Sequence, residues 1–222
     1  MEFPLEQIIA GLGRKPRVLF IANPNNPTGT LLHEKELRRI LRAATHTVVV
    51  IDEAYAEFSD FSVVPWIRRY PQLFVARTFS KVTGLAGLRL GAVIAREESL
   101  APVRRAMPPF PVNLAALVAA EAAAGDRSAM RAYVNEVKRL RKRLAAGLHE
   151  LNVKTFPSAG NFLLANFGPK GPALFGRLEK QGILLRDRSK DMGAGFVRIT
   201  IGTNSEMQQL LRLIRKEWKK FA

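Results

Sequence analysis

The sequence predicts an α/β protein in which a mostly parallel sheet is followed by a smaller α+β domain. In the first half, short apolar runs rich in β-branched residues alternate with segments of helical periodicity. Polar segments containing glycine or proline end these runs, which is typical of strands buried on both faces of a parallel sheet. In the second half, strands and helices follow without regular alternation, which favours an α+β arrangement.

The first half contains four predicted strands. A short helix over 5–11 precedes the first strand, which runs into the loop Asn23–Thr30. His33–Ala44 carries apolar residues at helical spacing, and a connection of helical character precedes the third strand. The strands are Val18–Ala22, Thr47–Ile51, Leu73–Ala76 and Leu90–Ala95. Their alternation with helices predicts right-handed crossovers between strands that are buried on both faces.

Three prolines within Met107–Val112 predict a hinge, which divides the chain into domains 1–112 and 113–222. The expected helices beyond the hinge are 114–124, 128–151, 172–181 and a last one that begins at Ser205. The helix over 128–151 has Tyr133 in its apolar stripe. In the last helix, the spacing of Ser205 and Gln208 fits a capping box. The expected strands are Val153–Phe156, Asn161–Asn166, Ile183–Arg186 and Phe196–Ile201.

The composition limits the kinds of site that the chain can have. It has 222 residues, of which 47% are hydrophobic, and this is enough for a sizeable buried core. The absence of cysteine excludes disulfides and thiolate metal sites, and three scattered histidines give no reason to expect a metal. No apolar run has the length of a membrane span and the N-terminus lacks a signal sequence, so we expect a cytoplasmic protein without a membrane partner.

The chain is strongly basic, with 35 Lys and Arg residues against 19 Asp and Glu and a net charge of +16. Such a balance suits a nucleic-acid partner, anionic substrates or the lack of an acidic portion. The helix over 128–151 carries many basic residues, but no aromatic residue is interleaved with them for base stacking. We therefore expect a solvated helix face and no nucleic-acid partner. A non-catalytic nucleic-acid-binding protein, with salt-dependent affinity, stays an alternative.

Polar side chains follow three of the predicted strands at their carboxyl ends. They are Asn26 after the first strand, Asp52 and Tyr55 after the second, and Lys81 after the third. Parallel strands place their carboxyl ends at one edge of a sheet, where ligand crevices lie, so these side chains converge if the strands are neighbours. A lysine buried in such a crevice loses its proton readily and can form a Schiff base with an aldehyde.

These segments resemble one enzyme family. Three segments resemble the large domain of fold-type-I pyridoxal-phosphate aminotransferases, above all that of the histidinol-phosphate aminotransferase branch. They are ANPNNPTG, VVVIDEAYAEF and RTFSKVTGLAGLRLG. The C-terminal domain of that branch resembles SAGNFLLANF, ILLRDRS and FVRITIGT, so the likeness covers essentially the whole chain. The resemblance implies the fold-type-I transferase fold, with residues 1–112 as a partial large domain.

The resemblance also implies pyridoxal phosphate as the cofactor. Lys81 matches the lysine that forms the Schiff base and moves the substrate's α-proton. Asp52 matches the carboxylate that faces the pyridine nitrogen, while Tyr55 and Asn26 match the groups that hydrogen-bond the phenolic oxygen. The residues that match the phosphate site are Thr78, Ser80 and Arg89.

The C-terminal segments imply a site for anionic substrates. Arg198 matches an arginine that binds a substrate carboxylate, Arg186 matches a second anion-binding arginine, and Asn161 lines the site or is structural. The RDRS run that starts at Arg186 favours transfer of an amino group from L-histidinol phosphate to 2-oxoglutarate, a step of histidine biosynthesis. Related branches that act on aromatic amino acids or decarboxylate phosphothreonine stay alternatives. We expect a homodimer in the full-length form.

One part of the family pattern has no counterpart before Val18. Members of the family carry there a Gly-containing phosphate loop at a helix N-terminus, an aromatic residue that stacks on the pyridine ring and an N-terminal arm. The chain thus resembles the C-terminal two-thirds of such an enzyme. We expect the chain alone to bind the cofactor weakly, to turn over negligibly and to self-associate through uncovered apolar surface.

Overall fold

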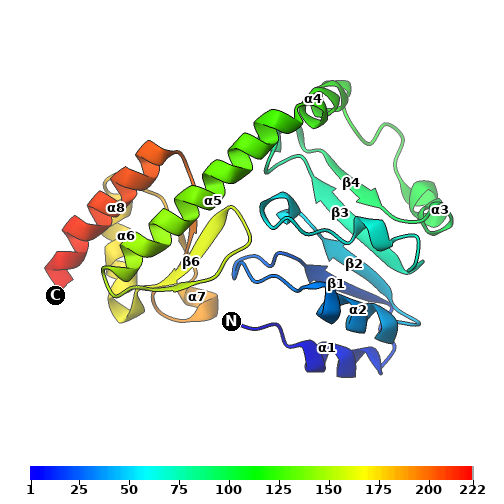
Figure 1. Ribbon diagram of the computed structural model, residues 1–222, viewed down its shortest axis with the longest axis horizontal. Helices are drawn as coiled ribbons and strands as arrows, with labels where there is room; N and C mark the ends of the chain where they lie inside the picture. Colours follow the sequence, from blue (N-terminus) through cyan, green and yellow to red (C-terminus); the bar gives the residue numbers. More distant parts are fainter. Residues whose placement is uncertain (222) are drawn as a thin grey trace. The chain divides into compact units, whose positions relative to one another are not determined.

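The computed structural model describes residues 1–221, which form two compact units (Figure 1). The lysine unit, named for Lys81, consists of residues 2–25 and 30–133. The arginine unit, named for Arg186 and Arg198, consists of residues 1, 26–29 and 134–221. The loop that carries Asn26 therefore belongs to the arginine unit, although it directly follows a strand of the lysine unit in sequence.

A four-stranded sheet with the order β1-β2-β3-β4 forms the centre of the lysine unit. Its strands are β1 (Val18–Ala22), β2 (Val48–Asp52), β3 (Leu73–Thr78) and β4 (Gly91–Ile94). Strands β1, β2 and β3 are parallel neighbours, which confirms the mostly parallel sheet. Strand β4 is antiparallel to β3 because the connection between them is a short loop without a crossover helix.

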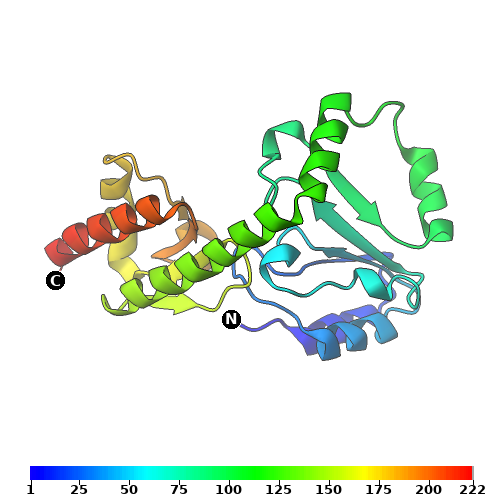
Figure 2. The ribbon, with the colours of Figure 1, turned by 45° about the horizontal axis from the view of Figure 1, so that its top comes forward.

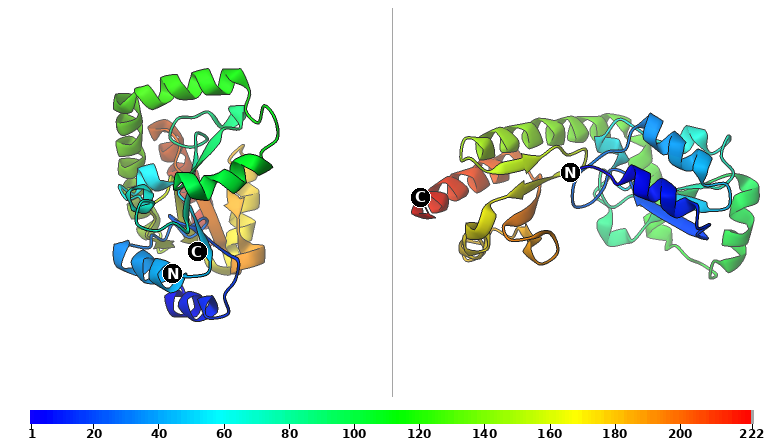
Figure 3. Two further views of the ribbon diagram at one scale, coloured as in Figure 1. Left: turned by 90° about the vertical axis from the view of Figure 1, so that its right-hand side faces the viewer. Right: turned by 90° about the horizontal axis from the view of Figure 1, so that it is seen from below.

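Helices α1 (Leu5–Leu12) and α2 (Glu34–Ala43) lie side by side and pack on one face of this sheet (Figures 1 and 3). Leu37, Ile40 and Leu41 of α2 lose all or nearly all of their solvent contact against the apolar residues of β2 and β3. Burial of each of these side chains stabilises the fold by about 1.5 to 3 kcal/mol. The helical spacing in the sequence therefore predicted the correct buried face.

The remaining elements of the lysine unit lie on connections and beyond β4. They are the 3-10 turns η1 (Ala56–Phe58), η2 (Val64–Trp66) and η3 (Ala86–Leu88), and the helices α3 (Glu97–Ala106), α4 (Leu114–Gly125) and the first part of α5 (Arg127–His149). The sequence analysis did not predict α3, which contains Pro102. Ala116 and Ala120 of α4 pack against Leu90, so α4 belongs with the sheet. The two compact units divide inside α5, after Tyr133.

The second face of the sheet is partly open, in contrast to the expectation that every strand is buried on both faces. Alternate residues of the strands point to this face, and four of the large apolar residues among them are more than one-third exposed. They are Val18 at 44%, Phe20 at 74%, Val48 at 37% and Val93 at 49%. The strand register places Val18 beside Val48, so the exposed side chains continue from strand to strand. We call these four residues the open face.

We expect the open face to drive self-association, and Phe20→Ser to reduce it. Burial of one such ring at a contact is worth about 2 kcal/mol, so the variant should raise the dissociation constant of self-association by about 30-fold. Sedimentation velocity over a range of concentrations measures this constant. Leu184→Ser is the matched control, since Leu184 is 79% exposed but lies in the arginine unit. Equal effects of the two variants would show that the open face has no particular role in association.

The arginine unit contains a second four-stranded sheet with the order β5-β6-β8-β7, in which all neighbours are antiparallel. Its strands are β5 (Lys154–Phe156), β6 (Phe162–Asn166), β7 (Arg186–Asp187) and β8 (Phe196–Thr200). Its helices are the remainder of α5, α6 (Gly171–Glu179), α7 (Ser189–Met192) and α8 (Asn204–Trp218), with the 3-10 turns η4 (Gly168–Lys170) and η5 (Lys219–Phe221). Helix α8 lies beside α5, where Leu211 packs against Gly147 (Figure 2). This mixture confirms the smaller α+β domain.

Three details of α5 and of the arginine unit differ from what the sequence predicts. Tyr133, the last residue of the lysine unit, is 40% exposed, and the buried stripe of α5 begins at Val134 instead. The expected strand Ile183–Arg186 shrinks to Arg186–Asp187, because the amide of Ile183 donates to the carbonyl of Leu178 and so continues the end of α6.

The N-terminus of α8 also differs. Its capping box joins Thr203 and Glu206, rather than Ser205 and Gln208. The amide of Thr203 donates to Glu206 Oε2 at 2.6 Å, and the amide of Glu206 donates to Thr203 Oγ1 at 3.3 Å. Thr203 and Glu206 also fit the capping-box spacing of a serine or threonine followed three residues later by a glutamate or glutamine, and the helix begins accordingly at Asn204.

Within residues 1–221, no helix is both long and apolar enough to cross a bilayer. The same residues contain no group of three or more His, Asp and Glu side chains arranged to hold a metal ion.

Candidate active site

The end of β2 places a carboxylate at the carboxyl edge of the parallel strands. Asp52 is the last residue of β2 and lies in register with Ala22 of β1 and Ala76 of β3. Its side chain is exposed, and its Oδ1 accepts a hydrogen bond from the amide of Ala54 at 2.9 Å. A carboxylate accepts through two oxygens, so Asp52 keeps acceptor capacity for a ligand.

Lys81 and Tyr55 lie close together at the same edge of the sheet. The Nζ of Lys81 is 5.4 Å from the centroid of the Tyr55 ring, within the range of a cation–π contact. Tyr55 is buried at 8% exposure, and Lys81 is half-buried. This proximity agrees with the prediction from the sequence, because Tyr55 follows β2 and Lys81 follows the neighbouring strand β3.

The loop from β3 to β4 carries the remaining predicted cofactor residues of the lysine unit. Thr78 Oγ1 accepts a hydrogen bond from the amide of Ser80 at 3.1 Å, which fixes the turn that leads to Lys81. Arg89 has a left-handed backbone with a φ of 56° and an exposed side chain, whose Nη1 donates to the carbonyl of Ala86 at 3.0 Å. The structure thus groups the two hydroxyls, while the guanidinium of Arg89 bonds within its own turn.

Glu53, which the sequence analysis did not single out, is the most buried charged residue beside the site. It is 1% exposed and follows Asp52 directly. Its carboxylate accepts from the amide of Val63 at 2.6 Å and from Ser62 Oγ at 2.8 Å, and it pairs with Arg77 at 2.8 Å. Burial raises the pKa of Glu53 above its ordinary value, although the Val63 amide and the positive charge of Arg77 act in the opposite direction.

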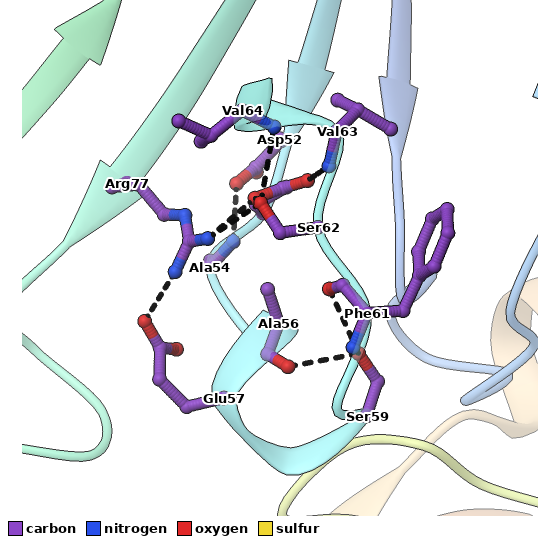
Figure 4. Close-up of polar contacts among 11 residues, drawn as sticks. Asp52, Ala54, Ala56, Glu57, Ser59, Phe61, Ser62, Val63, Val64 and Arg77 are labelled. Atoms are coloured by element: carbon purple, nitrogen blue, oxygen red, sulfur yellow. Dashed lines mark hydrogen bonds and ion pairs between the residues drawn. The ribbon is translucent and has the colours of Figure 1, made fainter. Parts of the chain in front are cut away.

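Arg77 completes this network from β3. Its Nη1 donates to Glu57 at 2.6 Å, and its Nη2 donates to Ser62 Oγ at 2.9 Å (Figure 4). A sequence signal for the network existed, because Arg77 stands inside the apolar strand LFVART and a charge in such a strand requires a partner. The sequence alone did not show which acidic residue that partner was.

The arginine unit holds a pair of arginines on neighbouring strands. Arg186 of β7 and Arg198 of β8 are directly opposite each other in the antiparallel register. Like charges in that position destabilise a sheet, unless an anion lies between them. Arg198 Nη1 donates to Asn26 Oδ1 at 2.7 Å, and its Cζ lies 5.5 Å from the centroid of the Phe162 ring. The Nε of Arg198 is buried and has no hydrogen-bond partner among the described residues. The pair is therefore well suited to bind an anion.

The loop that carries Asn26 is fixed by the segment before β6. The amide of Ala159 donates to the carbonyl of Gly29 at 2.8 Å. Gly29 has a φ of +77°, and a Cβ added there would lie 2.4 Å from Ser158 Oγ, so both conformation and space require glycine. Asn161 follows in the same segment, where its carbonyl accepts from the amide of Ile201 at 2.9 Å. Its backbone thus joins β6 to the end of β8.

Comparison with known proteins gives one family. A family model described as aminotransferase class I and II matches residues 2–214. A histidinol-phosphate aminotransferase of Legionella pneumophila (strain Lens) is 37% identical over 219 residues, which are 96% of this chain and 59% of that protein. The chain thus spans about 59% of the length of this curated relative.

Two solved structures are also similar. Histidinol-phosphate aminotransferase from Sinorhizobium meliloti, in complex with pyridoxal-5'-phosphate, matches with a TM-score of 0.90 at 26% identity, over 98% of this chain and 62% of that one. L-threonine-O-3-phosphate decarboxylase from Porphyromonas gingivalis matches with a TM-score of 0.81 at 26% identity, over 91% of this chain and 65% of that one.

Proposed function

The chain belongs to the class I and II aminotransferase family, and from this premise we propose that it forms the lysine-bearing part of a pyridoxal-phosphate-dependent aminotransferase. The observation that carries the proposal is the position of the Lys81 amine beside the Tyr55 ring, at the carboxyl edge of three parallel strands. Ligands of open α/β sheets bind at this edge.

The residues at this edge fit pyridoxal phosphate chemically. When bound, the cofactor supplies an aldehyde carbon that takes up an amino group and a pyridine ring that withdraws electrons. The half-buried Lys81 is the amine that would hold the aldehyde carbon and then move a proton at the substrate's α-carbon. Asp52 has acceptor capacity for a protonated ring nitrogen, and the phenol of Tyr55 is suited to donate a hydrogen bond to a ring oxygen.

The phosphate of the cofactor would be held by the hydroxyls of Thr78 and Ser80 and by Arg89. The two hydroxyls stand on one turn, which the hydrogen bond from the Ser80 amide to Thr78 Oγ1 orders. Arg89 uses one of its donors on Ala86 and has several others, so its guanidinium retains capacity for a phosphate oxygen. Asn26 is proposed as a further partner of the ring oxygen, in keeping with the matched motif.

For the substrates we propose L-histidinol phosphate as the amino donor and 2-oxoglutarate as the acceptor. Both are anions, which suits the opposed arginines Arg186 and Arg198 and the buried, unpartnered Nε of Arg198. The name of the Legionella pneumophila relative supports this donor. Asn161, which stands directly before the neighbouring strand β6, is proposed to line the same site. A homodimer and a cytoplasmic location complete the proposal.

A phosphothreonine decarboxylase is the second candidate. The similarity to the Porphyromonas gingivalis decarboxylase favours it, since it covers 91% of this chain at an identity comparable to that of the aminotransferase structure. The substrate of a phosphothreonine decarboxylase also carries a phosphate, so an arginine pair serves either reaction.

Reductive labelling tests the proposed function. The purified chain is mixed with pyridoxal phosphate, reduced with borohydride and digested, and the labelled lysines are identified by mass spectrometry. We expect preferential labelling of Lys81, because a half-buried amine in a crevice forms the linkage more readily than solvated amines do. Lys142, exposed on α5, serves as the internal reference. Labelling spread over the exposed lysines, with none at Lys81, would contradict the proposal.

A further inference from the structure

The carboxylate of Glu53 closes the loop that follows β2. One oxygen accepts from the amide of Val63, and the other accepts from Ser62 Oγ. Ser62 Oγ also accepts from the amide of Val64 at 3.1 Å, so a single buried carboxylate anchors the far end of the loop next to its beginning (Figure 4). The loop between these two points carries Tyr55.

Arg77 ties the same loop to the strand that leads to the catalytic lysine. It bonds to Glu53, to Ser62 and to Glu57, which stands on the 3-10 turn η1 directly after Tyr55. Arg77 lies on β3, four positions before Lys81. Its planar guanidinium can bond several oxygens in a fixed arrangement. It therefore both attracts the loop after β2 to strand β3 and sets the distance between them.

Tyr55 has its backbone held by the same turn. The amide of Ala56 donates to the carbonyl of Glu53 at 3.0 Å, and the amide of Phe58 donates to the carbonyl of Tyr55 at 3.1 Å. Asp52 lies directly before Glu53 on the adjoining strand end. A shift of the Glu53 side chain would therefore move Asp52 and Tyr55 together, relative to Lys81.

We propose that Glu53 and Arg77 are positioning residues, which hold Asp52 and Tyr55 in place beside the amine of Lys81. For its role in a reaction, this inference rests on the proposed function. It adds two residues whose hydrogen bonds and ion pairs join the loop after β2 to β3. Burial of Glu53 at 1% exposure makes its pairing with Arg77 necessary for the loop, because an unpaired buried carboxylate is strongly unfavourable.

The variants are chosen to keep the chain folded. Glu53→Gln keeps the size of the side chain and one acceptor but removes the charge. Arg77→Lys keeps the charge but loses the fork that bridges two carboxylates. The double variant Glu53→Gln/Arg77→Met leaves no unpaired charge in the buried position and is used if a single variant does not fold. Arg104→Met is the matched control, since it removes an ion pair with Glu97 on the exposed helix α3.

The first measurement needs no cofactor. The chain has three tyrosines, so incorporation of 3-fluorotyrosine gives three fluorine NMR signals, and Tyr55→Phe identifies that of Tyr55. We expect the Tyr55 signal to shift and broaden in Glu53→Gln and in the double variant Glu53→Gln/Arg77→Met. The shift should be smaller in Arg77→Lys, which keeps the charge, and the signal should stay unchanged in Arg104→Met. The signal of Tyr70, which lies outside the network, is the internal reference.

The second measurement is the yield of borohydride labelling at Lys81 with pyridoxal phosphate. We expect a loss of about 10-fold in Glu53→Gln relative to Arg104→Met, measured at a temperature at which both variants are folded, which is the size of effect that one lost charge-assisted hydrogen bond produces. A Tyr55 signal and a labelling yield equal to those of the unaltered chain would overturn the inference. If the unaltered chain itself is not labelled at Lys81, the proposed function fails. The fluorine signal of Tyr55 then decides the positioning role alone. A shift of this signal in Glu53→Gln supports that role, and an unchanged signal overturns it.

Discussion

Lys81→Ala is expected to lower amino-group transfer by about 10⁴-fold, the upper range for loss of a catalytic acid–base group, because in the proposed reaction Lys81 also supplies the nucleophilic amine. The chain spans about 59% of its Legionella pneumophila relative, so turnover is measured in a chimera in which the chain replaces the matched part of that relative. Transfer from histidinol phosphate to 2-oxoglutarate is the assay. Lys81→Arg should be equally inactive, since a guanidinium stays charged and cannot act as nucleophile or base.

Lys142→Ala is the control for this experiment, because Lys142 is an exposed lysine of α5 and should leave turnover unchanged. Thermal unfolding of each chimera shows whether the fold is intact. Retention of more than a small fraction of turnover by folded Lys81→Ala would remove this residue from the chemistry and with it the central assignment of the proposed function.

Arg198→Ala is expected to reduce kcat/KM for the oxo acid by about 100-fold in the same chimera, which corresponds to about 3 kcal/mol of lost charge-assisted hydrogen bonds. The residue has a buried Nε without a partner among the described residues, and it faces Arg186 across the strand pair. Both features support the proposal that its guanidinium binds an anionic substrate. Labelling of Lys81 with pyridoxal phosphate should persist, because Lys81 belongs to the other unit.

Arg212→Ala provides the matched control, since Arg212 is an exposed arginine on α8 of the same unit. Arg198→Lys should recover part of the activity, because an ammonium keeps the charge but not the bidentate geometry. Unchanged kinetics for the oxo acid in Arg198→Ala would place the substrate carboxylate elsewhere.

Several elements were predictable because their signals are local. Helix α2 and strand β1 follow from apolar periodicity within a few residues, and their bounds agree with the prediction to within one residue. The candidate residues Asp52, Tyr55 and Lys81 stand at fixed offsets from strand ends, so a correct strand assignment also located them. The capping of α8 was also a local signal, but two overlapping candidates competed and the wrong one was chosen.

Other features depend on partners that are distant in sequence. The exposure of Phe20 could not be predicted, because a strand of apolar residues has the same sequence pattern whether one or both of its faces are covered. Glu53 and Arg77 are 24 positions apart (77 minus 53), and the sequence around each residue does not identify the other as its ion-pair partner. The Asn26 loop follows β1 but is held by Ser158–Asn161, so its place in the arginine unit could not be read from its neighbours in the chain.

The sequence by itself determined the order and type of most elements, the chemistry of the candidate side chains and their attachment to strand ends, because periodicity and turn residues act over a few positions. Only the tertiary structure decided the antiparallel direction of β4, the buried pairing of Glu53 with Arg77 and the direct opposition of Arg186 and Arg198. These features depend on strand register and on which charges meet in a low-dielectric interior. Both are set by the packing of whole elements rather than by any short stretch of residues.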